Sequence, residues 1–384
     1  MLWETFNIMR DLSRLHDITT ILIRYGLGDM VRAVGLGNVL ERAGRILRWQ
    51  ENEEIAKEPL PVKVRRALEE LGPTFVKLGQ VLATRVDVFT PEWIAEFEKL
   101  QSNVPAVPFE LIRPEMEEAL GASPFDVFDD LQTEPVAAAS IAQVYFARLK
   151  SGEAVAIKVR RPGVTATIEA DLRILAHIAT LVELEVPESR RYHPVQIVAQ
   201  FSKSLARELD LAVEARNIER FATHFAQDEN VLIPRVYWEW TSEIMNVQER
   251  VEGIPGNDLA RVEREGLDRR MLAARGANTV LKMILVDGYF HADPHPGNVF
   301  YLPGNRLAIL DFGMVGRLSD ARRNQIVDLL AALSQRDNDG MLDVLLEWAG
   351  DAAVDDAKLA ADVNELVANY EDIPLKEVRF GVLL

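Results

Sequence analysis

The chain has no cysteine and no long apolar run. Without cysteine there can be no disulfide, thiolate catalysis or zinc–thiolate site, which is compatible with a reducing compartment such as the cytosol. The longest uncharged apolar runs, such as residues 18–23 and 283–286, are far shorter than the roughly 20 residues that span a bilayer. We therefore expect no transmembrane segment in this chain, and its start shows neither a signal peptide nor a transit peptide.

Basic residues are fewer than acidic ones. The chain has 43 Lys and Arg and 60 Asp and Glu, which gives a formal net charge of −17. A phosphate backbone would be repelled on average, so nucleic acid is not an expected partner. The length of 384 residues, 48% of them hydrophobic, provides for two packed domains or one large one with extensions.

The first 130 residues are predicted to be mostly helical. Apolar positions recur at helical spacing through residues 1–50, which favours a helix packed on its own domain over one lying on a membrane surface. A helix over 61–71 is predicted to break at Gly72-Pro73 before a second helix over 74–85. Thr90 and Ser123, each followed by proline, are predicted N-caps.

From residue 135 the pattern becomes mixed. Two alternating segments, 144–149 and 154–159, flank a short polar turn and predict a β-hairpin. Helices are predicted over 166–183, 194–226 and 268–288, strands within 231–240 and 243–251, and further helix after the N-cap Ser319. Residues 337–340 lack the acidic start and glutamate end of a calcium loop and indicate a turn between helices. The fold class predicted is α+β.

The densest motif lies at residues 290–313. His291-Ala292-Asp293 precedes Asn298 at the spacing of a kinase catalytic loop, and a short buried strand over 307–310 leads to Asp311 of an Asp-Phe-Gly triplet. Carboxylate and amide oxygens are ligands that Mg²⁺ prefers. We therefore predict that Asn298 and Asp311 hold magnesium while Asp293 orients a nucleophilic water or hydroxyl.

Upstream, Val-Ala-Ile-Lys at 155–158 places Lys158 on a strand, where it is predicted to bind the nucleotide phosphates. Its acidic partner is expected on the helix over 194–226, on which Asp210 and Glu214 share a face and Glu208 points elsewhere. An alanine-rich loop replaces the usual glycine-rich cover and must cover nucleotide in another way. That loop comprises Ala137, Ala138, Ala139, Ser140, Ile141, Ala142 and Gln143.

Two departures from protein kinases bear on the substrate. His295 stands where protein kinases commonly carry a lysine, and only five residues separate Gly313 from the next predicted helix. That spacing leaves no activation loop on which a peptide could lie. For His291 and His295, structural hydrogen bonding is favoured over participation in phosphoryl transfer.

The chain resembles the UbiB family of atypical, protein-kinase-like ATPases over residues 60–380. The resemblance is carried by KLGQ (77–80), AAASIAQV (137–144), VAIKV (155–159), ELD (208–210), FHADPHPGN (290–298) and LDFG (310–313). It implies a two-lobed protein-kinase-like fold with a helical N-terminal extension. The expected divisions are an extension at 1–105, an N-lobe at 106–252 and a C-lobe at 253–384.

The resemblance also implies residue roles. Lys77 and Gln80 of the KxGQ motif would gate the nucleotide site, and Glu208 of the ExD motif, which ends at Asp210, would pair with Lys77. Glu214 would then pair with Lys158. Spacing alone makes Lys77 and Gln80 a stripe on one helical face.

The function implied is that of an ATPase that supports ubiquinone biosynthesis. ATP or ADP and Mg²⁺ are the expected cofactors, and lipid intermediates and enzymes of quinone biosynthesis the expected partners. Peripheral membrane contact at the cytoplasmic face of the inner membrane is the expected localisation. Because the sequence stops at an apolar stretch, 380–384, we expect a longer protein in which a membrane anchor could follow.

Two other functions stay open. A small-molecule phosphotransferase of the aminoglycoside or choline kinase type also tolerates this catalytic loop, although KLGQ and the alanine-rich loop argue against it. The chain could instead be a nucleotide-switched binding module with slow chemistry. The phosphate acceptor, the quinone and the oligomeric state are not indicated by the sequence.

Overall fold

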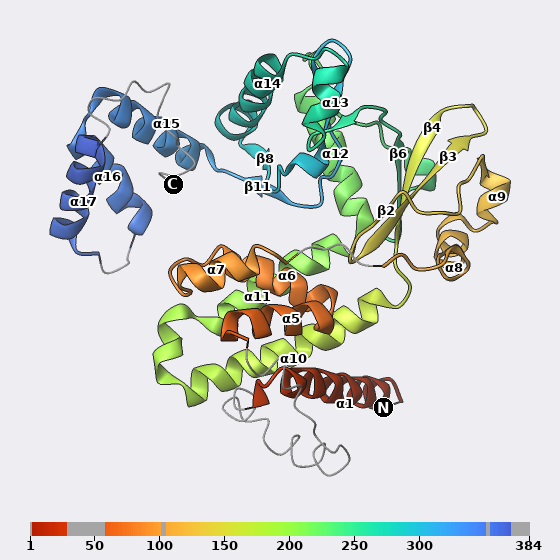
Figure 1. Ribbon diagram of the computed structural model, residues 1–384, viewed down its shortest axis with the longest axis horizontal. Coiled ribbons are helices and arrows are strands. Elements are labelled where there is room, and N and C mark those ends of the chain that lie inside the picture. The colour runs from red at the N-terminus through yellow and green to blue at the C-terminus, as the bar shows by residue number, and fades with distance from the viewer. Residues whose placement is uncertain (1, 29–57, 101–104, 351–353, 370–384) are drawn as a thin grey trace. The chain divides into compact units, whose positions relative to one another are not determined.

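The protein is described here from a computed structural model, which defines residues 2–28, 58–100, 105–350 and 354–369. The chain divides into two compact units (Figure 1). Unit 1 comprises Met1–Ala222 and Pro234–Val251, and unit 2 comprises Thr223–Ile233 and Glu252–Leu384. Both units combine helices with β-sheet, so the prediction of an α+β chain is confirmed.

Unit 1 begins with helices, as predicted. They are α1 (Leu2–Arg24), α5 (Leu60–Leu71), α6 (Pro73–Ala83), α7 (Pro91–Phe97), α8 (Phe109–Leu120) and α9 (Pro124–Val127). The break between α5 and α6 falls at Gly72, whose φ of 96° suits glycine. Thr90 and Ser123 occupy the predicted N-cap positions, but neither side chain caps its helix.

The predicted hairpin forms the centre of a five-stranded sheet in unit 1. Its strands are β1 (Phe128–Asp129), β2 (Ala137–Ala138), β3 (Ala142–Leu149), β4 (Ala154–Arg160) and β6 (Met245–Glu249). One face of β3, β4 and β6 packs on α8, around the fully buried side chains of Tyr145, Ile157 and Val247.

A second core of unit 1 lies among the helices. The long helices α10 (Val164–Glu185) and α11 (Pro194–Glu208) pack side by side, and α1, α5 and α6 contribute to the same apolar cluster (Figure 1). Ile18 of α1 is 1% exposed in this cluster, which supports the packed-helix interpretation. The predicted helical region at 29–50 lies outside the described residues.

The prediction of one helix over 194–226 is wrong. The structure has α11 ending at Glu208 and α12 (Leu211–His224) beginning after Asp210. Asp210 Oδ1 accepts a hydrogen bond of 2.9 Å from the backbone N–H of Ala212, as an N-cap side chain does. Asp210 and Glu214 therefore do not share a face of one helix.

Unit 2 holds the loop with the two histidines. Its strands are β5 (Val231–Leu232), β7 (Ile254–Pro255), β8 (Tyr289–His291), β9 (Val299–Leu302), β10 (Arg306–Ile309) and β11 (Val315–Arg317). Its helices are α13 (Leu259–Arg264), α14 (Arg269–Leu281), α15 (Asp320–Gln335), α16 (Asn338–Ala349) and α17 (Asp356–Asn369). Four strands form a sheet in the order β5, β10, β9, β7, and β8 pairs with β11.

The helix predicted over 268–288 is α14 followed by a π-helical turn, Lys282–Asp287. Lys282 Nζ bonds both carboxylate oxygens of Asp287, at 2.9 and 2.7 Å, and so links the ends of this turn. Ser319 caps α15 as predicted, and Asp337 caps α16, so residues 337–340 form the expected junction between helices.

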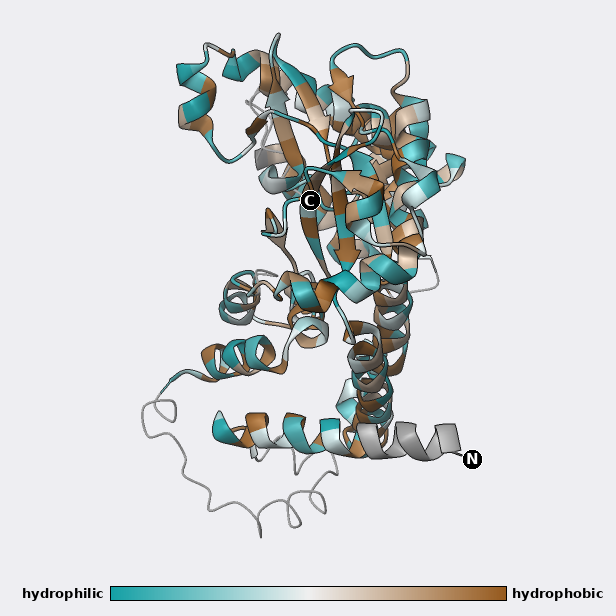
Figure 2. Ribbon diagram, turned by 90° about the vertical axis from the view of Figure 1, so that its right-hand side faces the viewer, coloured by the Kyte–Doolittle hydropathy of each residue, from teal (hydrophilic) through white to brown (hydrophobic). Residues whose placement is uncertain are grey.

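Colour by hydropathy shows how the helices use their two sides (Figure 2). The strands are mostly hydrophobic along their length, while the helices change from hydrophobic to hydrophilic turn by turn. This periodic change is expected of helices that bury one side only. Among the described residues, no helix combines the length and apolar character that a membrane crossing requires.

Candidate active site

Lys158 lies on β4, on the face of the sheet opposite the Tyr145 core. Its Nζ is 2.8 Å from Glu214 Oε2 and 3.0 Å from Glu214 Oε1, and Glu214 is only 5% exposed. Glu214 sits on the first turn of α12, so the cap by Asp210 also fixes where Glu214 lies along that helix. A buried carboxylate held against a strand lysine is the arrangement that orients a phosphate-binding lysine in kinases.

The second predicted pair joins α6 to α11. Lys77 Nζ is 3.0 Å from Glu208 Oε1, with both side chains mostly buried. Gln80, one turn further along α6, donates a hydrogen bond of 3.0 Å from its Nε2 to the carbonyl oxygen of Leu100. The structure therefore contains both predicted ion pairs, Lys77–Glu208 and Lys158–Glu214, while their roles stay predictions.

Gly79 of the KLGQ segment has a packing role that the sequence reasoning missed. A methyl group at this position would lie 2.2 Å from Leu100 Cδ1 and 3.0 Å from Leu68 Cδ1. Gly79 thus lets α6 lie close to both leucine side chains and keeps Gln80 within reach of the Leu100 carbonyl. A glycine inside a predicted amphipathic helix was the available signal.

The alanine-rich segment is partly strand. Ala137 and Ala138 form β2, Ala142 begins β3, and only residues 139–141 connect them. Gln143 projects to the Tyr145 side, away from Lys158, since it pairs in register with Val159. Its Nε2 bonds Val107 O and the Tyr145 hydroxyl at 3.1 and 2.8 Å, so its side chain is bound within the core.

In unit 2, the loop after β8 is organised by His291. The ring is buried, its Nδ1 accepts a 3.0 Å hydrogen bond from the Asp293 backbone N–H, and its Nε2 bonds the Asp311 carbonyl oxygen. A ring that accepts at Nδ1 and donates at Nε2 is neutral. Burial accordingly lowers the pKa of His291, and the carbonyl of Asp311 only partly offsets that effect. His291 thereby ties the Asp293 loop to Asp311, in the structural role favoured from sequence.

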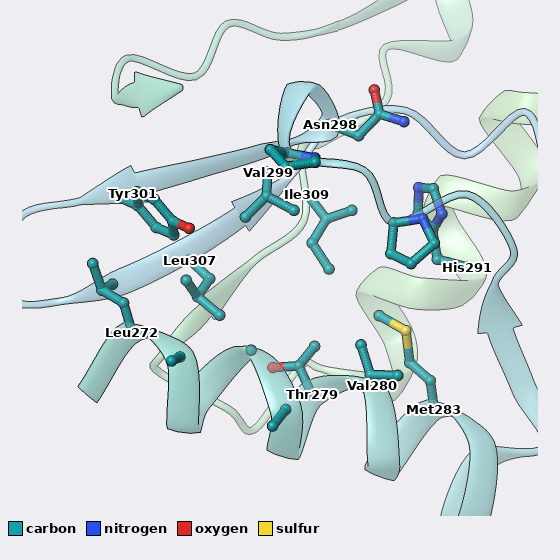
Figure 3. A pocket seen from close by; sticks show the side chains of 15 residues that line it. Leu272, Thr279, Val280, Met283, His291, Asn298, Val299, Tyr301, Leu307 and Ile309 are labelled. Atoms are coloured by element: carbon teal, nitrogen blue, oxygen red, sulfur yellow. The ribbon is translucent and has the colours of Figure 1, made fainter. Parts of the chain in front are cut away.

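Asn298 lies at the end of the same loop, directly before β9, and Asp311 lies directly after the β9–β10 hairpin. Asn298 Nδ2 donates to the Asp293 carbonyl oxygen at 3.2 Å, and the Asp311 side chain accepts from the Gly313 backbone N–H at 2.9 Å. The amide oxygen of Asn298 points away from the apolar pocket beneath it (Figure 3). His295 is half-exposed, with its Nε2 3.9 Å from Asp293 Oδ2.

Asn298 and Asp311 have the ligand types that Mg²⁺ prefers, because an amide oxygen and a carboxylate are hard oxygen donors. Within the described ranges, however, no three His, Asp or Glu side chains gather closely enough to bind a metal by themselves. That finding is compatible with a Mg²⁺ that takes few protein ligands and completes its shell with phosphate and water.

An apolar pocket of about 340 Å³ lies between α14 and the β9–β10 hairpin (Figure 3). Val280 and Met283 line it from the helical side, and Leu307 and Ile309 line it from the hairpin. His291 lies at one end, so this pocket adjoins the loop that carries Asp293 and Asn298.

The chain is similar to known proteins over nearly its whole length. The model of the ABC1 atypical kinase-like domain matches residues 99–345. Probable protein kinase UbiB of Sodalis glossinidius is 35% identical, over 98% of this chain and 70% of that protein. Probable protein kinase UbiB of Pseudomonas aeruginosa is also 35% identical, over 97% of this chain and 71% of that protein.

A likeness in fold extends to a solved structure from Mycobacterium tuberculosis, that of the Rv3197–erythromycin complex. It has a TM-score of 0.53 and 24% identity, and the match covers 79% of this chain and 77% of that one. Together with the matched domain, this likeness confirms the prediction of a kinase-like fold.

Proposed function

Since the chain belongs to the ABC1 atypical kinase-like family, we propose that it is a magnesium-dependent ATPase that supports ubiquinone biosynthesis. The observation that carries the proposal is the Lys158–Glu214 ion pair, at 2.8 Å on the face of the sheet opposite the Tyr145 core. Glu214 holds the ammonium group in place, so that Lys158 meets the α and β phosphates without reorganisation.

Other residues of the chain take complementary roles in this proposal. Asp293, positioned through its backbone by His291, orients the attacking water or hydroxyl. Asn298 and Asp311 would hold Mg²⁺, which when bound neutralises charge on the phosphates. Lys77 and Gln80 regulate access to the nucleotide, with Lys77 kept in place by Glu208.

Lipid intermediates of quinone biosynthesis, rather than a protein, are the proposed targets of the coupled activity. The support is the short connection after Gly313, where β11 begins at Val315 and α15 at Asp320. This leaves no loop of the length on which protein kinases bind peptides. We propose that the chain acts peripherally at the cytoplasmic face of the membrane that holds those lipids.

The test is phosphate release from MgATP by the purified protein, with and without liposomes and a prenylated phenol. Lys158→Ala and Asp311→Asn are expected to abolish turnover. Lys150→Ala is the matched control, because Lys150 lies in the exposed turn of the same hairpin and pairs with Asp129. A lipid- or phenol-stimulated turnover that only the first two variants lose would support the proposal.

The same assay separates the other two functions. Phosphate transfer that depends strictly on a soluble amine or sugar would indicate a small-molecule kinase. Nucleotide binding without phosphate release under any condition would indicate a binding module, in which the ATP-bound shape recruits partners.

A further inference from the structure

The apolar pocket of unit 2 owes its space to small residues on α14. Ala273, Gly276 and Ala277 are three and four residues apart, share one face of the helix and line the pocket. A methyl group added at Gly276 would meet nothing within 4 Å, so the space beside this turn of the helix is open. Any larger residue at position 276 would take up part of that space.

The volume of the pocket indicates the size of the ligand that it can hold. A cavity of about 150 Å³ with an apolar lining holds one benzene molecule. The pocket of about 340 Å³ is roughly twice as large, so it can hold on the order of twelve carbon atoms. Met283, Leu307 and Ile309 give it a mostly apolar lining, so most of the ligand must be hydrocarbon.

One polar group of the wall decides which hydrogen bond a ligand can make. Thr279 lines the pocket, is 5% exposed, and donates its hydroxyl hydrogen to the carbonyl oxygen of Arg275 at 2.8 Å. A hydroxyl has only one hydrogen, so Thr279 Oγ1 can only accept from a ligand. Tyr301, on the hairpin side of the pocket, has a hydroxyl that can donate or accept (Figure 3). The requirement for a donor on the ligand therefore comes from Thr279.

The pocket also contacts the loop between β8 and β9. Pro294 and Pro296 of this loop line it, whereas Asp293 and Asp311 are not among its lining residues. The amide oxygen of Asn298 points away from it (Figure 3). A ligand in the pocket would therefore contact the loop through the two prolines, without meeting the two carboxylates.

We propose that this pocket binds an aromatic alcohol of about twelve carbon atoms, whose hydroxyl group donates a hydrogen bond to Thr279 Oγ1. A rigid ring system suits the site better than a flexible chain, because it loses less conformational entropy on binding. The bound alcohol restrains the loop through Pro294 and Pro296, so it is an effector of the loop and not an acceptor of phosphate. This site lies outside the phosphate chemistry of the proposed function and can be tested without nucleotide.

The experiment is a fluorescence titration of the nucleotide-free protein with 4-phenylphenol and with its methyl ether, 4-methoxybiphenyl, which lacks the donor. The parent should bind 4-phenylphenol on the order of tenfold more tightly, the difference that one hydrogen bond makes. Thr279→Val should remove this preference, and Thr279→Ser should keep it. Thr180→Val is the matched control, because Thr180 Oγ1 makes the same bond to the carbonyl oxygen four residues earlier, at 2.9 Å, on α10 of unit 1.

Two substitutions at Gly276 test where the ligand binds. Leucine would fill the pocket and has a higher helix propensity than glycine. Gly276→Leu should therefore lose binding of 4-phenylphenol without a fall in melting temperature, and Gly276→Ala, which leaves most of the space, should keep it. In the parent, bound 4-phenylphenol should slow hydrogen exchange over residues 290–300, as mass spectrometry would show.

Several results would contradict the proposal. Equal binding of the two compounds by the parent would overturn it, as would a preference that survives Thr279→Val or full binding by Gly276→Leu. Unchanged hydrogen exchange over residues 290–300 at saturation would overturn the effector role. None of these measurements involves Lys158, so the proposed function stands or fails separately.

Discussion

Asp171 is predicted to hold α1, α6 and α10 together through a buried charge. Its side chain is 0% exposed, and it accepts hydrogen bonds from Arg14 Nε at 2.6 Å and from Thr74 Oγ1 at 2.7 Å. Arg14 also donates to the carbonyl oxygen of Leu71 at 2.6 Å, at the end of α5. The network therefore fixes the turn between α5 and α6, from which the KLGQ segment follows.

Asp171→Asn keeps the shape of this side chain and removes its charge. Removing one partner of a buried pair costs about 3–5 kcal/mol. Because Arg14 is 18% exposed and asparagine retains an acceptor, we expect a loss of about 2–3 kcal/mol. For a unit of this size, that loss lowers the melting temperature by roughly 4–12 °C. Faster hydrogen exchange in Pro73–Ala83, followed by mass spectrometry, should accompany it.

Asp11→Asn is the matched control, because Asp11 and Arg173 join the same helices, α1 and α10. Their contact of 2.7 Å is similar in geometry, but the two side chains are 28% and 41% exposed. An exposed pair contributes about 0–1 kcal/mol, so this variant should change the melting temperature little. Equal effects of the two substitutions, or unchanged exchange in α6 of Asp171→Asn, would refute the reasoning.

Three other predictions concern single positions. Gly79→Ala should destabilise unit 1 by about 1–3 kcal/mol through overpacking against Leu100, as a urea titration would show, and Leu100→Val should restore part of the loss. Gly276→Ala should instead stabilise by about 0.5–1 kcal/mol, because a methyl group there meets nothing within 4 Å inside α14; a lowered melting temperature would contradict this. Burial, with the nearby Glu118, raises the pKa of Glu115 against the effect of Arg160. The charged form therefore costs stability, so the advantage of Glu115→Gln in thermal unfolding should grow as pH rises above the ordinary pKa of glutamate, about 4.3, and be absent at lower pH.

The local elements were predictable because their signals are local. Gly72-Pro73 marks the end of α5, and alternation over 144–149 and 154–159 gives β3 and β4. Ser319, a residue type that favours the N-cap position, likewise marks the start of α15. Each depends on backbone conformation or on residues within one turn or one hairpin, which a single sequence displays directly.

The break at Asp210 was missed because its cause competes with periodicity. Apolar residues keep helical spacing through 194–226, but the Asp210 side chain bonds the Ala212 N–H and starts a new helix. Such local bonds are why aspartate favours caps over helix interiors. The π-helical turn Lys282–Asp287 was missed for a similar reason, since its register depends on the Lys282–Asp287 bonds and not on composition.

Of the site, sequence spacing predicted the residue types and their order along the chain. The pairing of Glu208 with Lys77 came only from the family resemblance, because residues 77 and 208 lie on helices far apart in sequence. The carboxamide of Asn246 and the Oε1 of Gln248 are buried without a hydrogen-bond partner in the part of the chain that the structure describes, and this could not be read from sequence at all. They become visible only when strand register assigns each side chain to a face of the sheet.

The close packing at Gly79 also limits how the family can vary. Because a methyl group at position 79 would occupy the space of the Leu100 and Leu68 side-chain ends, these three positions share one fixed volume. In related chains, a larger residue at position 79 should therefore occur together with a smaller one at 100 or 68. Position 79 would then covary with positions 100 and 68, which lie outside the motif. Glycine at position 79 would be required for packing as well as for any role of the motif in binding.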